Sequence, residues 1–485
     1  MLNAEVNSKF TSAFTHSAFR TVAVVCCCAS AILLTGAQQQ TASGPTAWPD
    51  LAPLHKQLDA RGISEAALPT YLDRLRQTHA ARVREGDLDH LIFYLLQSQA
   101  FTTIPAIEPA LSAKALVEGF ELKEREAFLR TGAANVARVP EGVRARIGAL
   151  LRALGAPSRD ERILYFGELV QATFPQAAER TNGLSREYLR VMRFVYQKEF
   201  VAQRALKPAE AVAELYRSRG LSTDTAVEAG YVVSIGLAIA KALAPEQRIR
   251  KVLIVGPGLD LAPRTGLLEV GPPQSYQPWA VMDALVANDL ARLDDLEVVA
   301  ADINPRVVAH IRRARATPPT LNLVSEIGDS DTVELSPDFR NYFAALGRSI
   351  GAQGTSPVAG AAVKGHLRRT IKTSAEAART LRGETLDIVT DRLREGGFDL
   401  IVATNILPYF DDGELMLALS NIAGMLAPGG VFLHNEARPA LGGITAALGM
   451  PFEQSRHAVI ANVRGAPAPL FDSVWLHRKA RAPQR

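Results

Sequence analysis

The feature that most limits the possible folds is an apolar run that ends in two glycines. Residues 251–258, KVLIVGPG, combine β-branched residues with a Gly-Pro-Gly turn, as expected of a buried parallel strand that enters a tight turn. Three later runs share this character, and helical stretches separate them: LEVVAAD at 296–302, FDLIVAT at 398–404 and GGVFLHNE at 429–436. Strands that alternate with helices predict an α/β fold, with a mostly parallel sheet covered by helices on both faces.

Two further segments modify this simple sheet. HAVIANV at 457–463 and SVWLHR at 473–478 flank a proline-bearing turn, which predicts an antiparallel hairpin at the edge of the sheet. Residues 351–365, GAQGTSPVAGAAVKG, have the composition of a flexible linker. A basic cluster lies at and after the end of this stretch, and we interpret it as a solvated helix face in preference to an anion-binding patch. The cluster comprises Lys364, Arg368, Arg369 and Lys372.

Residues 48–244 show helical periodicity and almost no strand signal. The segment after Pro140 stops at Gly155, which is the usual asymmetry of proline at the start and glycine at the end of a helix. Ser158 and Glu161 fit a capping box ahead of an apolar run. We therefore predict an all-α domain before the α/β domain. The expected boundaries are 1–37 for a leader, 38–47 for a linker, 48–220 for the helical domain and 221–485 for the α/β domain, with insertions at 262–286 and 325–377.

The first 37 residues have the pattern of a signal peptide. Lys9 and Arg20 precede an apolar stretch at 21–34, and residues 35–37, TGA, suit signal peptidase. All three cysteines, at 26–28, lie in the apolar stretch, so the cleaved chain has no disulfide or thiolate metal site, and we expect no metal. An uncleaved anchor is the second interpretation, and the leader is the only membrane contact expected. Either interpretation predicts an exported protein, whereas a misassigned start codon leaves the protein cytoplasmic.

The composition excludes one class of protein and gives no support to another. With 47% hydrophobic and 21% charged residues over 485 positions, the chain can bury a sizeable core, so whole-chain disorder is excluded. The 54 Lys and Arg residues against 50 Asp and Glu give a net charge of +4. This excess is too weak to indicate nucleic-acid binding, which needs a concentrated basic face. The oligomeric state stays open.

Residues suited to a ligand collect at the ends of the first two predicted strands. Gly256 and Gly258 end the first strand, where open α/β sheets bind ligands because a backbone without β-carbons lets them approach. Asp302 ends the second strand, and its carboxylate can accept both hydroxyls of a ribose. Two alternatives stay open. The glycine turn also suits tight packing or a dinucleotide, and Asp302 also suits the cap of a helix that begins at Pro305.

The later part of the chain separates these cofactor classes. Residues 398–410, FDLIVATNILPYF, and 426–433, LAPGGVFL, closely resemble class I S-adenosylmethionine-dependent methyltransferases. Within that family, the TNILPYF stretch is similar to chemotaxis-receptor methyltransferases. The resemblance covers roughly residues 225–477. It implies a Rossmann-like sheet with an antiparallel C-terminal hairpin, S-adenosylmethionine as cofactor, and in-line transfer of its methyl group to an acceptor that the sequence does not identify.

The resemblance also implies roles for individual residues. The two glycines face the methionine part of the cofactor, and Asp302 holds the ribose. Glu384 with Thr385 lies by the adenine, with Asp387 as a less favoured substitute, although Glu384 equally suits a surface carboxylate. Asn405 lies beside the sulfonium. The residues implied to contact the cofactor are Gly256, Gly258, Asp260, Asp302, Ile303, Glu384, Thr385 and Asn405.

The chain departs from the family pattern around the glycine turn. Ile254 stands where an acidic residue is usual, and Asp260 replaces a third glycine. Asp260 either contacts the amino group of the cofactor or only caps the next helix. The glycines and Asp302 are about twice as far apart as usual, and the extra segment, 262–286, predicts a functional lid. The candidates for substrate contacts are Arg264, Tyr276, Trp279 and Tyr409, although Trp279 equally suits the core.

Methyl transfer needs little acid–base catalysis, and the sequence identifies no single residue as the general base. His434 and Glu436 are candidates, with a structural role preferred for His434. Residues 221–236 are expected to form the other wall of the pocket. Methyl transfer is the leading interpretation. The alternative is an exported, non-catalytic binding or scaffold protein on the same fold, which Ile254, Asp260 and the leader support. An NAD-dependent oxidoreductase is less favoured because of the terminal hairpin.

Overall fold

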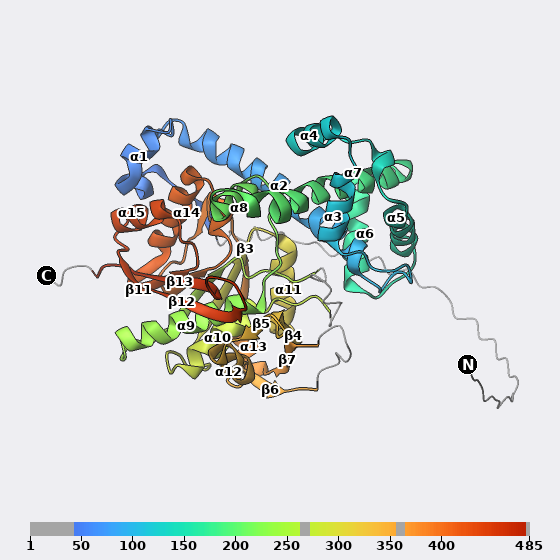
Figure 1. The fold of residues 1–485 in the computed structure, drawn as a ribbon. Helices are drawn as coiled ribbons and strands as arrows, with labels where there is room; N and C mark the ends of the chain where they lie inside the picture. The colour runs from blue at the N-terminus through green and yellow to red at the C-terminus, as the bar shows by residue number, and fades with distance from the viewer. Residues whose placement is uncertain (1–42, 262–271, 356–363, 482–485) are drawn as a thin grey trace, which may run out of the picture. The chain divides into compact units, whose positions relative to one another are not determined.

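The computed structural model describes residues 43–261, 272–355 and 364–481, and all of them belong to one compact unit (Figure 1). The predicted leader at 1–37 lies outside these ranges. Within them, no helix combines the length and the apolar character needed to cross a bilayer. Residues 43–45, part of the predicted linker, instead form a short strand, β1 Ser43–Pro45, which pairs with β9 Asp391–Leu393.

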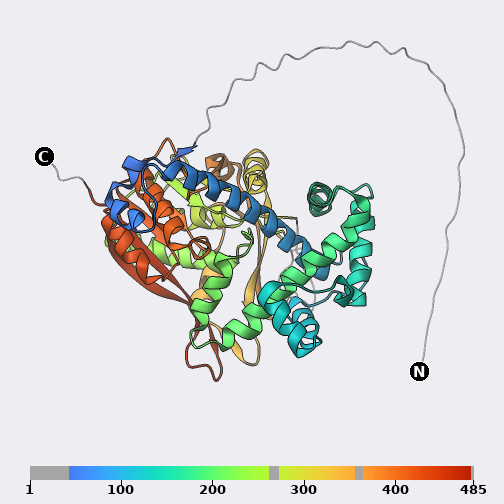
Figure 2. The ribbon, with the colours of Figure 1, turned by 90° about the horizontal axis from the view of Figure 1, so that it is seen from above.

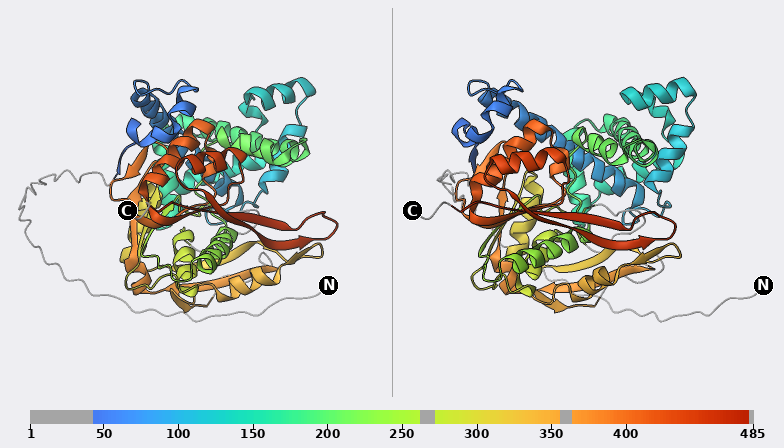
Figure 3. Two further views of the ribbon diagram at one scale, coloured as in Figure 1. Left: turned by 90° about the vertical axis from the view of Figure 1, so that its left-hand side faces the viewer. Right: turned by 60° about the vertical axis from the view of Figure 1, so that its left-hand side comes forward.

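A central sheet of eight strands organises the C-terminal half, in the order β5-β12-β13-β11-β10-β2-β3-β8. The predicted strands are confirmed, and the C-terminal hairpin, β12 with β13, is antiparallel as predicted. Figure 3 shows the long red hairpin extending beyond the other strands. The strands are β2 Lys251–Val255, β3 Glu297–Asp302, β5 Val333–Leu335, β8 Leu381–Thr385, β10 Phe398–Ala403, β11 Leu426–His434, β12 Phe452–Val463 and β13 Leu470–Arg478.

The strand order identifies the type of sheet. Five strands, β8, β3, β2, β10 and β11, run parallel, and β13 is antiparallel to β11. Apart from the short β5, the order by position in the chain is 3-2-1-4-5-7-6. The dinucleotide-binding sheet has the order 3-2-1-4-5-6, so the difference is a last strand inserted antiparallel between the fifth and the sixth. The fold is therefore the Rossmann-like sheet of class I methyltransferases, as the sequence predicts.

The alternation of side chains along β2 explains why both faces of the sheet are covered. Val252 and Ile254 point into one apolar cluster, and Leu253 and Val255 point into another on the opposite face. A strand buried on both faces needs apolar residues at every position. On the first face lie α9 Val227–Leu243, α10 Gln277–Ala287 and α13 Ala375–Thr380. On the second lie η1 Trp48–Leu54, α1 His55–Asp59, α14 Asp412–Met425 and α15 Pro439–Ala447.

The N-terminal half is helical, as predicted. The capping box at residues 158–161 is wrong, because α6 begins at Glu161 and its cap is Asp160, which accepts the amides of Arg162 and Ile163. The helices are α2 Leu68–Gln97, α3 Pro109–Glu118, α4 Leu122–Thr131, η2 Val136–Arg138, α5 Glu141–Leu154, α6 Glu161–Thr173, α7 Ala177–Tyr196, the π-turn η3 Gln197–Val201, η4 Ala202–Arg204 and α8 Pro208–Arg217.

Helix α2 belongs to two cores. Its first turns, with Leu72 and Leu75, pack in the cluster on the second face of the sheet, and its last turns, with Leu91 and Leu95, pack among the other N-terminal helices. Figure 2 shows the blue helix running from the sheet layers to that helical cluster. The middle of α2 is therefore held next to the segment that precedes the sheet.

A small sheet lies between β3 and β8 and overlaps the predicted insertion at 325–377. After α11 Pro305–Ala316, β4 Thr320–Gly328 pairs with β7 His366–Thr373, which pairs with β6 Gly351–Gln353, and α12 Pro337–Ala345 packs against it. Residues 351–353 are thus a strand and not a linker. The basic cluster lies on and just before β7, so its interpretation as a helix face is wrong. Three of its residues lie on that strand: Arg368, Arg369 and Lys372.

Candidate functional site

The carboxyl ends of four parallel strands meet at one cavity. The strands β8, β3, β2 and β10 are neighbours, and the order of the sheet reverses between β2 and β10, which is where open α/β sheets bind ligands. His79 and Val83 on α2 and residues 221–225 close the cavity from the other side. The lining residues that follow or end the strands are Val255, Gly256, Gly258, Ala301, Asp302, Ile303, Asn304, Leu386, Asp387, Ile388, Thr404, Asn405, Ile406, Tyr409 and Phe410.

The turn after β2 requires its two glycines. Gly256 and Gly258 have φ values of +68° and +74°, a region in which residues with a β-carbon are strained. A β-carbon on Gly256 would lie 2.5 Å from the Ile406 side chain, and one on Gly258 would lie 2.6 Å from the Thr223 carbonyl oxygen. The glycines therefore permit both the turn itself and the close approach of the covering segment.

Asp302 lies at the end of β3 and is nearly buried, with 6% of its surface exposed. Burial raises the pKa of its carboxyl to about 7, against the opposing effect of the Asn304 and Gly258 amides. The cap of α11 is Asn304, which accepts the amide of Arg306. The second interpretation, Asp302 as that cap, is therefore wrong, because Asn304 occupies the position. Asp302 remains at the cavity as an acceptor for hydroxyl groups.

The end of β8 contributes Asp387, whereas Glu384 and Thr385 do not line the cavity. Glu384 pairs with Arg382 at 2.9 Å, and Thr385 is exposed. The chain turns into the cavity only after the strand ends, where Leu386 donates its amide to the Asp302 carbonyl at 3.0 Å. This turn brings Asp387, the less favoured candidate, to the position expected of the adenine contact.

A histidine from the helical half completes this corner. His79 is 2% exposed, and its two ring nitrogens lie 2.7 Å from the Asp387 carboxylate and 3.0 Å from the Glu414 carboxylate. Both nitrogens face acceptors, which suits the doubly protonated ring. Burial lowers the pKa of His79, but hydrogen bonds and charge from the two carboxylates outweigh burial and raise it to about 9. A charged imidazolium thus orients Asp387 at neutral pH.

The stability that His79 contributes is expected to depend on pH. Its pKa is higher in the folded protein, about 9, than the ordinary value of 6.5, so the contribution is complete below pH 6.5 and is lost as the pH rises through 9. The difference corresponds to about 3 kcal/mol. Urea unfolding of the wild type and His79→Gln should show a stability gap that shrinks by about this amount between pH 6.5 and 9.5. A gap that does not change with pH would contradict the charged state.

Asn405 follows β10 in a backbone conformation that is rare for residues other than glycine, with φ at +62°. Asn435 holds it there, because Asn435 accepts the Asn405 amide at 2.9 Å and donates to its side-chain oxygen at 2.7 Å. Asn435 also donates to Asp472. Strained backbone that neighbours hold in place is common at functional sites, and Asn405 lies on the cavity beside the glycine turn.

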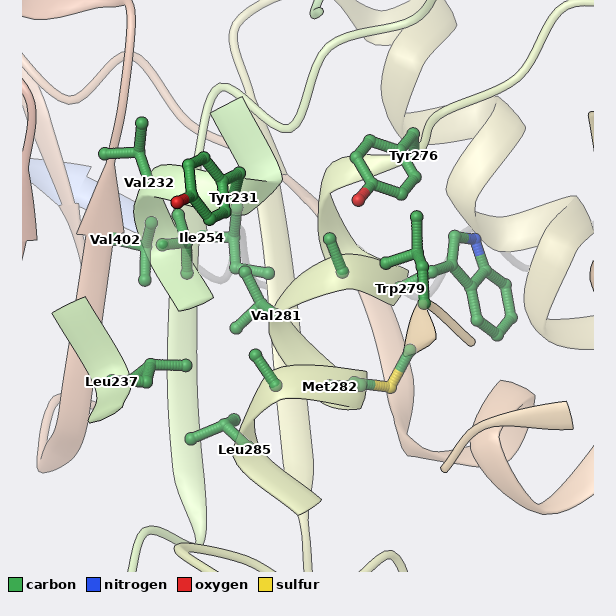
Figure 4. Close-up of a cluster of buried hydrophobic side chains, with 14 of the residues drawn as sticks. Tyr231, Val232, Leu237, Ile254, Tyr276, Trp279, Val281, Met282, Leu285 and Val402 are labelled. Carbon is green, nitrogen blue, oxygen red and sulfur yellow. The ribbon is translucent and has the colours of Figure 1, made fainter. Parts of the chain in front are cut away.

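Several predicted site residues lie elsewhere. Tyr276 and Trp279 are buried in the apolar cluster on the first face of the sheet, as Figure 4 shows, and Tyr276 bonds to Tyr342 at 2.5 Å. They are core residues because α10 packs against α9 and not across the cavity. Asp260 is outside the cavity lining, and its backbone pairs with Gln274. Arg264 lies outside the described residues.

Neither candidate base lies at the cavity. His434 is fully buried and stacks on His477 with ring centroids 5.1 Å apart, and burial holds its pKa well below the usual value. Its preferred structural role therefore agrees with its position. Glu436 accepts the amide of Arg438 at 3.0 Å. Within the described ranges, no group of three or more His, Cys, Asp or Glu residues is arranged to hold a metal ion.

Sequence reasoning missed His79 altogether. It is one histidine within a charged helix, far from the strands, and no local pattern marks it. Of the segment 221–236, which we expected to form a wall, residues 221–225 line the cavity. The rest of that segment, from Val227 on, belongs to α9, which packs in the apolar cluster on the first face of the sheet.

The cavity is narrow, although its polar groups suit a nucleoside. Asp302 and Asp387 line it from neighbouring strand ends, so that hydroxyl and amino groups of one ligand can meet a carboxylate each. Its free volume is about 90 Å³, below the roughly 300 to 1,000 Å³ of common ligand pockets. Residues 221–225 cover the cavity, and Thr223 holds them in place through two hydrogen bonds to Leu259, of 2.7 and 2.9 Å. A nucleoside therefore needs residues 221–225 to move outward.

No family model and no curated protein matches this chain. Solved structures resemble it weakly. A TehB-like SAM-dependent methyltransferase from Corynebacterium glutamicum is 13% identical and covers 52% of this chain and 88% of its own, with a TM-score of 0.27. The N-methyltransferase NodS from Bradyrhizobium japonicum, in complex with S-adenosyl-L-homocysteine, is 13% identical over 52% of this chain and 86% of its own, with a TM-score of 0.25. The CurJ carbon methyltransferase is 14% identical over 89% and 99%, with a TM-score of 0.28. The fold assignment depends on the strand order alone.

Proposed function

We propose that this protein transfers the methyl group of S-adenosylmethionine to an acceptor. The observation that carries the proposal is the meeting of Asp302, the glycine turn and Asn405 in one cavity at the reversal point of a sheet with the methyltransferase strand order. Among the solved structures that resemble this chain, NodS was solved in complex with S-adenosyl-L-homocysteine.

Different residues of the cavity would bind different parts of the cofactor. Asp302 would accept the ribose hydroxyls, and Asp387, oriented by His79, would accept the amino group of the adenine. Gly256 would let the backbone approach the methionine part, next to Asn405. The bound cofactor supplies an activated methyl group on its sulfonium. The protein then needs mainly to align the acceptor with that methyl group and to exclude water.

Calorimetric titration of the full-length protein tests the proposal. We expect S-adenosylmethionine and S-adenosylhomocysteine to bind with one site per chain, and NAD not to bind at the same concentration. NAD is the matched control because it shares the adenosine but needs a different arrangement beyond the ribose. Failure of both sulfur nucleotides to bind would contradict the proposal. Binding without methyl transfer to any of a broad acceptor panel would favour the non-catalytic scaffold.

We also propose that the protein is exported. The pattern of the leader, basic residues before an apolar stretch and small residues after it, supports this location. Mass spectrometry of the amino terminus of the native protein tests it. We expect the mature chain to begin at Gln38, whereas an intact or downstream start would contradict cleavage at this site.

A further inference from the structure

A second and larger cavity adjoins the first. Its volume is about 650 Å³, within the range of roughly 300 to 1,000 Å³ that holds small organic ligands. Four residues line both cavities: Ser222, Asp224, Asn405 and Tyr409. The two cavities therefore meet beside Asn405, where the proposed function places the transferred methyl group. A molecule in the second cavity can present an atom to that methyl group.

The side chain of Asn405 has a fixed orientation at this junction. Asn435 accepts the backbone amide of Asn405 at 2.9 Å, so the atom of Asn435 that does so is its side-chain oxygen. The other polar atom of the Asn435 side chain is then its nitrogen, which is a donor only and lies 2.7 Å from the Asn405 side chain. The atom of Asn405 that faces Asn435 must therefore be the oxygen.

This orientation leaves the side-chain nitrogen of Asn405 available to a ligand. In the part of the chain that the structure describes, no hydrogen bond engages that nitrogen, and the residue is exposed. An amide NH₂ group donates hydrogen bonds and accepts none. It therefore suits a ligand oxygen with free lone pairs better than the N–H groups of an amine.

Aromatic rings form one wall of the second cavity. Tyr409 lies at the junction, and its hydroxyl is held by the Ser222 amide. Tyr216 packs edge to face against Tyr409, with ring centroids 5.5 Å apart and an angle of 86°, and Phe194 packs similarly against Tyr216 at 6.0 Å. Aromatic rings attract further rings in offset or edge-to-face packing, beyond what their buried area contributes. This wall thus favours an aromatic body over a saturated one.

Both cations in the described part of the lining already have partners. These cations are Lys198 and Arg219. Lys198 lies 3.1 Å from Glu199, and Arg219 lies 2.6 Å from Asp89. A ligand carboxylate would have to compete with these carboxylates for its counter-charge. The lining therefore favours an uncharged hydroxyl as the source of the ligand oxygen.

We infer that the methyl acceptor is an aromatic hydroxyl compound, whose rings lie against Tyr216 and Tyr409 and whose oxygen accepts a hydrogen bond from Asn405. This inference depends on the proposed function. The donor stabilises the ionised oxygen and so makes the hydroxyl easier to deprotonate. The hydroxyl loses its proton to water, an oxygen lone pair forms a bond to the methyl carbon, and the carbon–sulfur bond breaks with its electrons left on sulfur. The products are an aryl methyl ether and S-adenosylhomocysteine.

Titration of the full-length protein, saturated with S-adenosylhomocysteine, tests the acceptor class at neutral pH. The probes are 2-naphthol, 2-naphthylamine, the saturated decahydro-2-naphthol and the anion 2-naphthoate. We expect 2-naphthol to bind about fivefold more tightly than 2-naphthylamine, which cannot replace the hydrogen bond from Asn405. It should also bind about fivefold more tightly than decahydro-2-naphthol, which lacks the ring packing. 2-Naphthoate should bind more weakly than 2-naphthol.

Each comparison has an outcome that would contradict the inference. Equal affinity of 2-naphthol and decahydro-2-naphthol would overturn the aromatic body. Equal or tighter binding of 2-naphthylamine or 2-naphthoate would overturn the hydroxyl group. Either result leaves the cofactor proposal intact, whereas failure of S-adenosylhomocysteine itself to bind would overturn both proposals.

Asn405→Gly tests the donor separately from the rings. Glycine adopts the φ of +62° without strain, so the turn is kept while the NH₂ group is removed. We expect the preference for 2-naphthol over 2-naphthylamine to disappear. The preference for 2-naphthol over decahydro-2-naphthol should remain, which also shows that the variant folds and keeps the second cavity. An unchanged preference over 2-naphthylamine would overturn the inference.

A variant of the aromatic wall adds a further readout. Tyr216 lines only the second cavity, so Tyr216→Leu should weaken 2-naphthol about fivefold and leave the affinity for S-adenosylhomocysteine unchanged, which also shows that the variant folds. The matched control is Tyr196→Leu. Tyr196 is likewise half-buried beside a ring, that of Phe200 at 5.3 Å, but it lines neither cavity. Equal affinity of the two variants for 2-naphthol would overturn the inference.

Discussion

Replacing Asp302 with alanine is expected to weaken the binding of S-adenosylhomocysteine about 100-fold or more. The carboxylate is the acceptor at the end of β3, and hydrogen bonds to a charged group contribute about 1.5 to 3 kcal/mol each. Loss of two such bonds to the ribose costs about 3 kcal/mol or more, and each 1.4 kcal/mol is a factor of ten in affinity. Calorimetry at pH 8, where the carboxylate is charged, measures the effect.

The same carboxylate allows a control that separates binding from folding. Its pKa in the folded protein is raised to about 7 from the ordinary 3.8, so the folded state binds the proton more tightly, and the stability contributed by this group falls as the pH rises from about 4 to 7. Asp302→Asn removes that penalty. We expect this variant to melt at the same or a higher temperature at pH 8 while still binding the nucleoside more weakly. Parallel loss of stability and binding would contradict the assigned role.

Ligand affinity of the wild type should follow the same ionisation. Because the charged carboxylate is the better acceptor, S-adenosylhomocysteine should bind more weakly as the pH falls from 8 to 6, through the raised pKa of about 7. The Asp302→Asn variant should lack this part of the pH dependence.

Replacing Gly86 with alanine is expected to destabilise the protein by about 3 kcal/mol, the upper end of the roughly 1 to 3 kcal/mol that overpacking typically costs. In an exposed helix interior the same change normally stabilises by roughly 1 kcal/mol. Here a β-carbon would lie 1.9 Å from the Leu221 carbonyl oxygen, which is backbone and cannot rotate away. A β-carbon on Gly220 would in turn lie 2.3 Å from the backbone nitrogen of Gly86 on α2. Urea unfolding measures the loss.

The matched control is Gly148→Ala in α5. Its β-carbon would meet only the end of the Arg152 side chain at 3.5 Å, an ordinary contact, so the change should be neutral or slightly stabilising. Because Gly86 lies on α2 about two turns after His79 and packs against Leu221, which lines the cavity, Gly86→Ala should also reduce nucleoside binding. A Gly86→Ala variant as stable as Gly148→Ala would contradict the close approach of the two backbones.

The local sequence pattern was sufficient to predict the central sheet. Apolar β-branched runs such as 251–255 and 398–403 can bury both faces only inside a parallel sheet, and glycine or a polar residue directly after a strand must lie at its carboxyl edge. Gly256, Asp302 and Asn405 were therefore predicted at one edge, and the structure places all three on the same cavity. Prediction from the sequence failed just past the end of β8. The turn there decides whether Glu384 or Asp387 faces the cavity, and the path of a turn leaves no periodic pattern in the sequence.

The sequence by itself determined the order of strands and helices along the chain, and with it the edge of the sheet where a ligand binds. The hydrophobic period and the turn residues that define these elements involve only residues close together in the sequence. Only the tertiary structure decided that α2 lays His79 against Asp387, that Tyr276 and Trp279 enter the core, and that a second cavity opens behind Tyr409. These arrangements depend on contacts between distant segments, such as Gly86 against Leu221. Such contacts depend on tertiary packing, and no local sequence pattern predicts them.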